Sequence, residues 1–91
     1  MPRGIPVAAG TGDVQGFTGA TTLVGYSIRE TTAAVAVVQL RDGTGTGDPL
    51  RVTIGLGAGA GQVAPLPAIQ FDTGIFVDRT SGTTELVLYI T

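Results

Sequence analysis

Apolar and polar residues alternate most clearly between residues 32 and 56. A period of two places the apolar side chains on one face of a β-strand. Two such runs flank residues 42–49, which are rich in Gly and Asp and end in Pro, a composition typical of a hairpin with a long loop. The pattern predicts two half-buried strands with these inward residues: Ala34, Ala36, Val38 and Leu40, then Leu50, Val52, Ile54 and Leu56.

Shorter runs with the same period predict strands over residues 21–30, 62–64, 68–71, 75–79 and 83–90. In the first, Val24, Tyr26 and Ile28 share one face, and Leu23 takes the other. Pro65 and Pro67 cannot donate to a ladder, so their segment belongs at a sheet edge or in a crossing between sheets. Short strands at a spacing of roughly ten residues predict an all-β fold, a small antiparallel β-sandwich or jelly-roll-like barrel. The expected core contains Val38, Leu40, Val52, Ile54, Leu86, Leu88 and Ile90.

The first twenty residues differ from the rest, because Gly and Pro interrupt them too often for a long regular element. We expect an extended N-terminal arm over residues 1–20, with room for one short strand, followed by a single sandwich domain over residues 21–91. The arm is either a disordered terminus or a segment that orders against a partner. Disordered tails are usually poorer in large apolar residues. The partner-binding residues expected in the arm are therefore Ile5, Val7, Val14 and Phe17.

Composition favours association with other protein. A chain of 91 residues forms one domain, and such a domain buries only roughly 60–65% of its unfolded surface. The sequence holds no Cys and no His, so disulfides and the commonest metal ligands are absent. Charged residues make up 13%, against roughly 25% in an average soluble domain. Contacts with copies of itself or with a larger partner are the remaining source of stability.

Several partners are not expected. The net charge is −2, and the five cations are arginines spread along the chain without a basic run, so no nucleic-acid partner is predicted. No apolar run approaches the roughly 20 residues of a membrane span, and the first residues lack the apolar core of a signal peptide. We therefore predict no membrane partner and no export.

No enzyme is predicted either. A Ser or Thr nucleophile needs a nearby base, usually His or Lys, and the chain has neither. A carboxylate pair drawn from Asp72, Asp78 and Glu85 would resemble a glycosidase site. Each of these residues, however, lies beside a turn or on the outward side of a strand, where a solvated charge is the simpler interpretation. We expect no catalytic residue.

Cofactor and ligand motifs are weak. The glycine-rich segment 55–61 opens no helix that could bind a pyrophosphate, so a loop is predicted. Asp42 and Asp48 flank a glycine-rich turn but lack the further carboxylates of a calcium loop, so a solvated turn is predicted. Tyr26, Phe76 and Tyr89 are too few for a strong sugar-binding platform. No cofactor and no metal are expected.

Four segments resemble a group of small structural proteins of tailed bacteriophages, particularly phages of high-GC hosts: LVGYSIRETT (23–32), VQLRDG (38–43), GIFV (74–77) and SGT (81–83). The match spans residues 20–90. The resemblance implies a compact β-sandwich that serves as a building block of the particle, such as a head decoration protein or a small tail component. It places no functional residue by motif.

The favoured expectation is a non-enzymatic virion protein that is made in the host cytoplasm and then decorates and stabilises the assembled capsid surface. Its partners would be copies of itself, as a homotrimer, and the major capsid protein or other virion proteins. Repeated weak contacts on one particle would give strong attachment. The alternative is a tail or fibre component that binds a receptor or glycan. An apolar underside would favour the first function, and exposed aromatic residues beside carboxylates would favour the second.

Overall fold

The computed structural model describes residues 2–91, which form eight strands and no helix. Every strand pairing is antiparallel, which confirms the all-β prediction. The strands are β1 (Arg3–Gly10), β2 (Val14–Thr18), β3 (Thr21–Glu30), β4 (Ala36–Asp42), β5 (Leu50–Leu56), β6 (Gly61–Phe71), β7 (Gly74–Ser81) and β8 (Thr84–Ile90).

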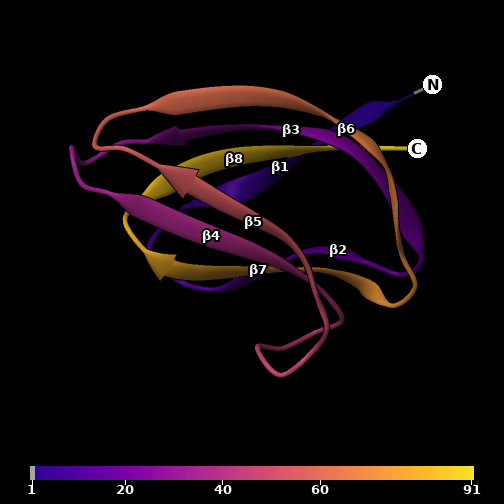
Figure 1. Ribbon diagram of the computed structural model, residues 1–91. Coiled ribbons are helices and arrows are strands. Elements are labelled where there is room, and N and C mark those ends of the chain that lie inside the picture. The colour runs from indigo at the N-terminus through magenta and orange to yellow at the C-terminus, as the bar shows by residue number, and fades with distance from the viewer. Residues whose placement is uncertain (1) are drawn as a thin grey trace.

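The strands form two four-stranded sheets, β1-β8-β3-β6 and β2-β7-β4-β5, which pack face to face (Figure 1). The pairings are nested: β4 pairs with β5, β3 with β6, β2 with β7, and β1 with β8. The whole chain is thus one long hairpin that has been folded over into two layers. This is the jelly-roll arrangement.

The core lies between the two sheets and contains the residues predicted from the alternation. Six of them are almost completely buried, and Val52 packs against them while half-buried. The six are Val38, Leu40, Ile54, Leu86, Leu88 and Ile90.

The β4–β5 hairpin confirms the predicted pair of strands but not all of their inward positions. Strand β4 begins at Ala36, and Ala34 is exposed in the preceding bend. In β5 the register shifts, because Leu40 pairs with Val52 whereas Arg41 pairs with Leu50. The extra residue turns Leu50 out of the core and leaves it 46% exposed.

A bulge in β3 also changes an expected face. Leu23 pairs with Ile90 of β8, whereas Gly25 pairs with Tyr89, so Val24 is the extra residue. The bulge reverses the alternation, because one inserted residue moves the following side chains to the other face. Leu23 is therefore fully buried, and Val24, which was predicted to share a face with Tyr26, is only half-buried.

Strand β6 is a single edge strand where two short strands were expected. It passes through Pro65 and Pro67 without ending. Its pairing with β3 shifts between Leu23, opposite Ile69, and Gly25, opposite Pro65. The position confirms the expectation that these prolines lie at a sheet edge, where a missing N–H breaks no ladder.

The described part of the expected arm, residues 2–20, instead forms β1 and β2, one edge strand of each sheet. Edge positions tolerate the irregular residues of this segment, because Pro6 and the bulge near Gly16 interrupt pairing on one side only. A Cβ on Gly16 would come within 2.9 Å of Leu88 Cδ1, so the glycine allows β2 to approach the core. The sandwich therefore begins at Arg3.

Candidate functional site

The outer face of the sheet β1-β8-β3-β6 is mainly apolar, although it points away from the core. Two rows of paired residues cross it from β1 through β8 and β3 to β6. Ser27 is the polar member of these rows, and Val63 is 75% exposed. We call this surface the apolar face: Gly4, Tyr89, Gly25 and Pro65 in one row, and Pro6, Val87, Ser27 and Val63 in the other.

Tyr89 lies flat across the apolar face because its neighbours on both sides are glycines. A Cβ on Gly4 would come 3.4 Å from Cε1 of the Tyr89 ring, and a Cβ on Gly25 would come 3.7 Å from its Cδ2. Aromatic rings that cover glycines in this way stabilise the exposed side of a sheet. The result is a surface of low relief with a half-buried aromatic residue near its centre.

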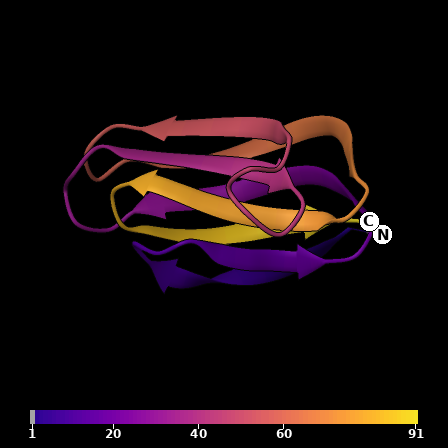
Figure 2. The same ribbon diagram turned by 90° about the horizontal axis from the view of Figure 1, so that it is seen from below.

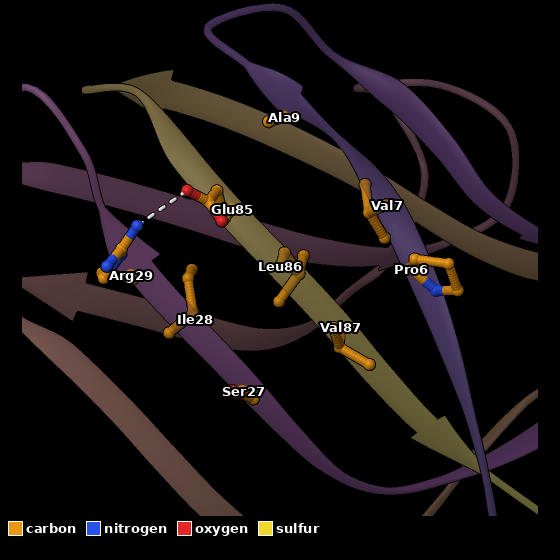
Figure 3. Close-up of a pocket in the computed structure, with 9 residues that line it drawn as sticks. All are labelled: Pro6, Val7, Ala9, Ser27, Ile28, Arg29, Glu85, Leu86 and Val87. Atoms are coloured by element: carbon orange, nitrogen blue, oxygen red, sulfur yellow. Dashed lines mark hydrogen bonds and ion pairs between the residues drawn. The ribbon is translucent and has the colours of Figure 1, made fainter.

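One end of the apolar face carries an open hollow of about 390 Å³ (Figure 3). An ion pair borders it, in which Arg29 Nη2 lies 2.9 Å from Glu85 Oε1. Both side chains are more than half exposed, so water screens the pair. The hollow is lined by Pro6, Val7, Ala9, Ser27, Ile28, Arg29, Glu85, Leu86 and Val87.

The polar side chains that line the hollow are those of Ser27, Arg29 and Glu85. Within residues 2–91, every buried side-chain nitrogen and oxygen has a hydrogen-bond partner, so none is directed at an absent ligand. The same residues hold no cluster of three or more His, Cys, Asp or Glu that could bind a metal ion. The face offers apolar surface for contact over most of its area, with one ion pair at its margin.

The outer face of the second sheet, β2-β7-β4-β5, is polar and internally paired. Arg41 donates from Nε to Asp78 Oδ2 at 3.0 Å, from Nη2 to Gln39 Oε1 at 2.8 Å, and from Nη1 to the Asp48 carbonyl at 3.1 Å. Gln15 donates to three backbone carbonyls. We call this surface the polar face: Gln15, Phe76, Arg41, Asp78, Gln39, Thr53 and Thr80.

Glu30, at the end of β3, is a buried carboxylate that binds three loops through hydrogen bonds. It accepts hydrogen bonds from the Thr32 hydroxyl at 2.6 Å and from the backbone N–H groups of Thr32, Ala34, Gly59 and Thr83. The Thr32 hydroxyl contributes most to lowering the pKa of Glu30 from 4.5 to about 2, against the opposing effect of burial. The residue therefore stabilises the structure, and it is not free to act as a general base.

Asp42, at the end of β4, plays the same part on the other sheet. Its carboxylate accepts hydrogen bonds from the N–H groups of Asp72 and Thr73 and pairs with Arg51 at 3.2 Å. These bonds, that from Asp72 first, lower the pKa of Asp42 from 3.8 to about 2. The predicted turn is exposed at Thr44, Thr46 and Gly47, although Asp42 itself is only 7% exposed. Asp48 binds its own turn through the N–H groups of residues 44 and 45.

Arg79 is a buried cation between the two sheets. Its guanidinium donates to the carbonyls of Ala8, Gly12 and Thr84 and to the Thr84 hydroxyl. Burial lowers its pKa, and the nearby Asp13 carboxylate opposes this effect. The residue holds the β1–β2 connection against β7 and β8, so its guanidinium is bound by groups of the same chain.

The four residues expected to bind a partner lie together at the edge formed by β1 and β2. Val7 is buried in the core, and Ile5, Val14 and Phe17 pack against the core while half-buried. The guanidinium carbon of Arg3 lies 5.8 Å from the centre of the Phe17 ring. These side chains already contact their own chain, so they do not form a free docking surface.

The other candidates from the sequence do not come together. Asp78 lies on the polar face and Glu85 on the outer side of the opposite sheet, so they form no catalytic pair. Tyr26 is buried, with its hydroxyl donating to Gln62 Oε1 at 3.0 Å. Phe76 and Tyr89 are on opposite outer faces, so the three aromatic residues make no platform.

Comparison of the chain with protein-family models, with curated proteins and with solved structures gives no match. Residues 2–91 include no helix that is long and apolar enough to cross a membrane. The function therefore has to be argued from the surfaces described above.

Proposed function

We propose that this protein is a non-enzymatic structural component of a tailed-bacteriophage virion, and that it decorates the assembled head through its apolar face. The observation that carries the proposal is the contrast between the two outer faces. Polar groups of one face bind each other, whereas the other face exposes Val63 and a row of apolar neighbours. Jelly rolls occur in viral capsid proteins, which supports the proposal by analogy of fold.

The size of the face suits such a contact. The two larger dimensions of the molecule are 34 and 28 Å, enough for the roughly 800 Å² per partner of a standard interface. Burial of apolar surface contributes about 25 cal/mol per Å², and the low relief around Tyr89 suits a broad contact. Repetition over a symmetric particle would multiply modest single contacts into stable attachment.

A second candidate is a receptor- or glycan-binding module of a tail or fibre. It is favoured by one observation: Tyr89 and Glu85 project from the same side of β8, so an aromatic ring and a carboxylate share one face. The hollow beside the Arg29–Glu85 pair would then hold the sugar. The low relief of the rest of the face suits a protein surface better.

The test uses heads of the phage that encodes this chain, assembled in its absence. Purified protein is added, and bound protein is measured by co-sedimentation and located by electron microscopy. Val63→Lys should weaken binding at least about tenfold, because it places a charge in an apolar contact. Ser81→Lys adds the same charge at an exposed position of β7, on the other sheet, and should bind as the unaltered protein does.

Two results would overturn head decoration. One is an unaltered protein that does not bind heads. The other is binding that survives Val63→Lys but is lost in Ser81→Lys. Retention of the unaltered protein by host-surface polysaccharide, in the absence of head binding, would support the second candidate instead.

A further inference from the structure

The sandwich has four edge strands, and three of them carry features that oppose the addition of another strand. Strands β1 and β2 form one side of the molecule, and β5 and β6 form the other (Figure 2). Pro6 lies within β1, two prolines lie within β6, and β2 is short and bulged near Gly16. Proline, bulges and short length are the usual means by which natural sheets protect their edges.

Strand β5 is the least protected, because its bulge is confined to its first two residues. It contains no proline, and its pairing with β4 is regular from Val52 to Leu56. Three of its residues, Arg51, Thr53 and Gly55, are exposed on the polar face. Because β5 is an edge strand, one side of its backbone has no ladder partner among the described residues. The exposed Leu50 lies at its first position.

The sequence of β5 complements itself in the antiparallel direction. Thr53 lies at the middle of β5, so a two-fold axis at Thr53 pairs the residues from Arg51 to Gly55 with those of a second copy. In that register Thr53 faces Thr53 of the partner subunit, and Val52 faces the partner's Ile54. Thr–Thr and aliphatic pairs of this kind stabilise neighbouring strands.

The same register suits the charged end of the strand. Arg51 faces the partner's Gly55, so two like charges never stand opposite each other. Each Arg51 also keeps its own counter-ion, Asp42, at 3.2 Å. Leu50 lies outside this register, because the bulge at Arg51 turns it to the polar face, where it is 46% exposed.

We propose that the free edge of β5 binds β5 of a second copy of this chain about a two-fold axis, joining two four-stranded sheets into one of eight strands. The pairing replaces the homotrimer expected from the sequence with a dimer, and it does not depend on the proposed function. A two-fold axis perpendicular to the joined sheet leaves both apolar faces on the same side. The dimer would therefore offer two contact surfaces to one flat partner.

The test exploits the meeting of residue 53 with itself. Thr53→Lys and Thr53→Glu each place like charges opposite one another at the axis, and each should raise the dimer dissociation constant at least about tenfold. An equal mixture of the two variants places opposite charges there and should restore a dimer. Molar mass is measured by light scattering and sedimentation on the order of 10–100 µM.

One further variant serves as a control, and another tests the register directly. Val63→Lys alters the other sheet and should remain dimeric, and circular dichroism with thermal unfolding shows that each Thr53 variant is folded. The chain has no native Cys, so Thr53→Cys should form an intermolecular disulfide on oxidation, since opposed antiparallel residues lie within disulfide range. A monomeric unaltered protein, a trimer, or a dimer that is unchanged by both charge variants would overturn the proposal.

Discussion

The two outer faces of the sandwich arise from the same alternation of residues but differ in how they meet water. On the polar face, Arg41, Asp78 and Gln39 bind one another. On the apolar face, glycines, prolines and valines surround Tyr89, and an ion pair lies at the margin. The difference teaches that one face satisfies its polar groups within the single chain, whereas the other exposes apolar side chains, as the proposed contact requires.

The largest expected effect on stability comes from removing the N-terminal edge strand of each sheet. Deleting residues 1–16 removes β1, part of β2 and the buried side chain of Val7. The deletion also removes the partners of the buried Arg79 guanidinium at Ala8 and Gly12. The loss should exceed a typical domain stability of about 5–15 kcal/mol. We expect no cooperative thermal transition by circular dichroism, and a folded truncated protein would show that the first strands are dispensable.

Acid should unfold both halves of the molecule, because each sheet ends in a carboxylate with a lowered pKa. Glu30 and Asp42 have folded-state pKa values of about 2, against 4.5 and 3.8 as ordinary values. A lowered pKa means that the unfolded chain binds protons more readily. The stability contributed by Glu30 and Asp42 is therefore complete above their ordinary values and is lost as the pH falls toward 2.

Urea unfolding between pH 6 and pH 2 checks this prediction. The unaltered protein should lose stability over that window, and Glu30→Gln should be less stable at neutral pH while losing less on acidification. Asp42→Asn should behave in the same way from the other sheet. A free energy of unfolding that stays constant between pH 6 and pH 2 would contradict the stabilising role of these carboxylates.

The core between the faces should respond equally to changes made from either sheet. Ile54 of β5 and Leu88 of β8 are both almost completely buried. Truncation of either side chain to Ala should lower the free energy of unfolding by about 2–5 kcal/mol, through lost burial and a residual cavity. Chemical denaturation measures both variants. A loss well below this range at one position only would mean that the core is not shared by the two sheets.

The smallest expected effects distinguish the ion pairs of the two sheets. The side chains of Arg41 and Asp78 are 20% and 11% exposed, whereas those of Arg29 and Glu85 are 65% and 53% exposed. Asp78→Asn leaves Arg41 without its carboxylate in a half-buried site and should cost about 1–3 kcal/mol. Glu85→Gln should cost only about 0.2–1 kcal/mol, because water solvates the exposed pair. Equal losses of unfolding free energy for the two variants, measured by urea titration, would contradict this contrast between the two faces.

The alternation of residues predicted the sheet content and most of the core, because burial on one side imposes a period of two. Bulges are what it could not predict. One extra residue at Val24 and another at Arg51 reverse the faces of Leu23 and Leu50. Such insertions depend on pairing with distant strands, which a local pattern does not contain.

The residues predicted to bind a partner are not those of the proposed contact surface, for a related reason. Residues 1–20 were expected to form an arm because Gly and Pro interrupt them, and the large apolar residues of this arm, Ile5, Val7, Val14 and Phe17, were therefore assigned to a partner. Edge strands, however, tolerate both Gly and Pro. The available signal was elsewhere, in the apolar residues Val87 and Tyr89 at positions predicted to face outward. Buried carboxylates left a weaker signal, since Glu30 is bonded not only by the nearby Thr32 and Ala34 but also by Gly59 and Thr83, which are distant in sequence.

The pairing of β1 with β8 has a consequence for how the chain folds. Arg3 is paired with Ile90, and both are near the ends of a hairpin whose other pairs lie nested inside them. Contacts between residues so far apart in sequence form slowly, because the chain must lose the entropy of closing a long loop before these contacts can stabilise it. On the ribosome, β1 must wait for β8 to emerge. Until then one edge of β3 has no ladder partner. A chaperone that binds extended segments would act mainly at this stage.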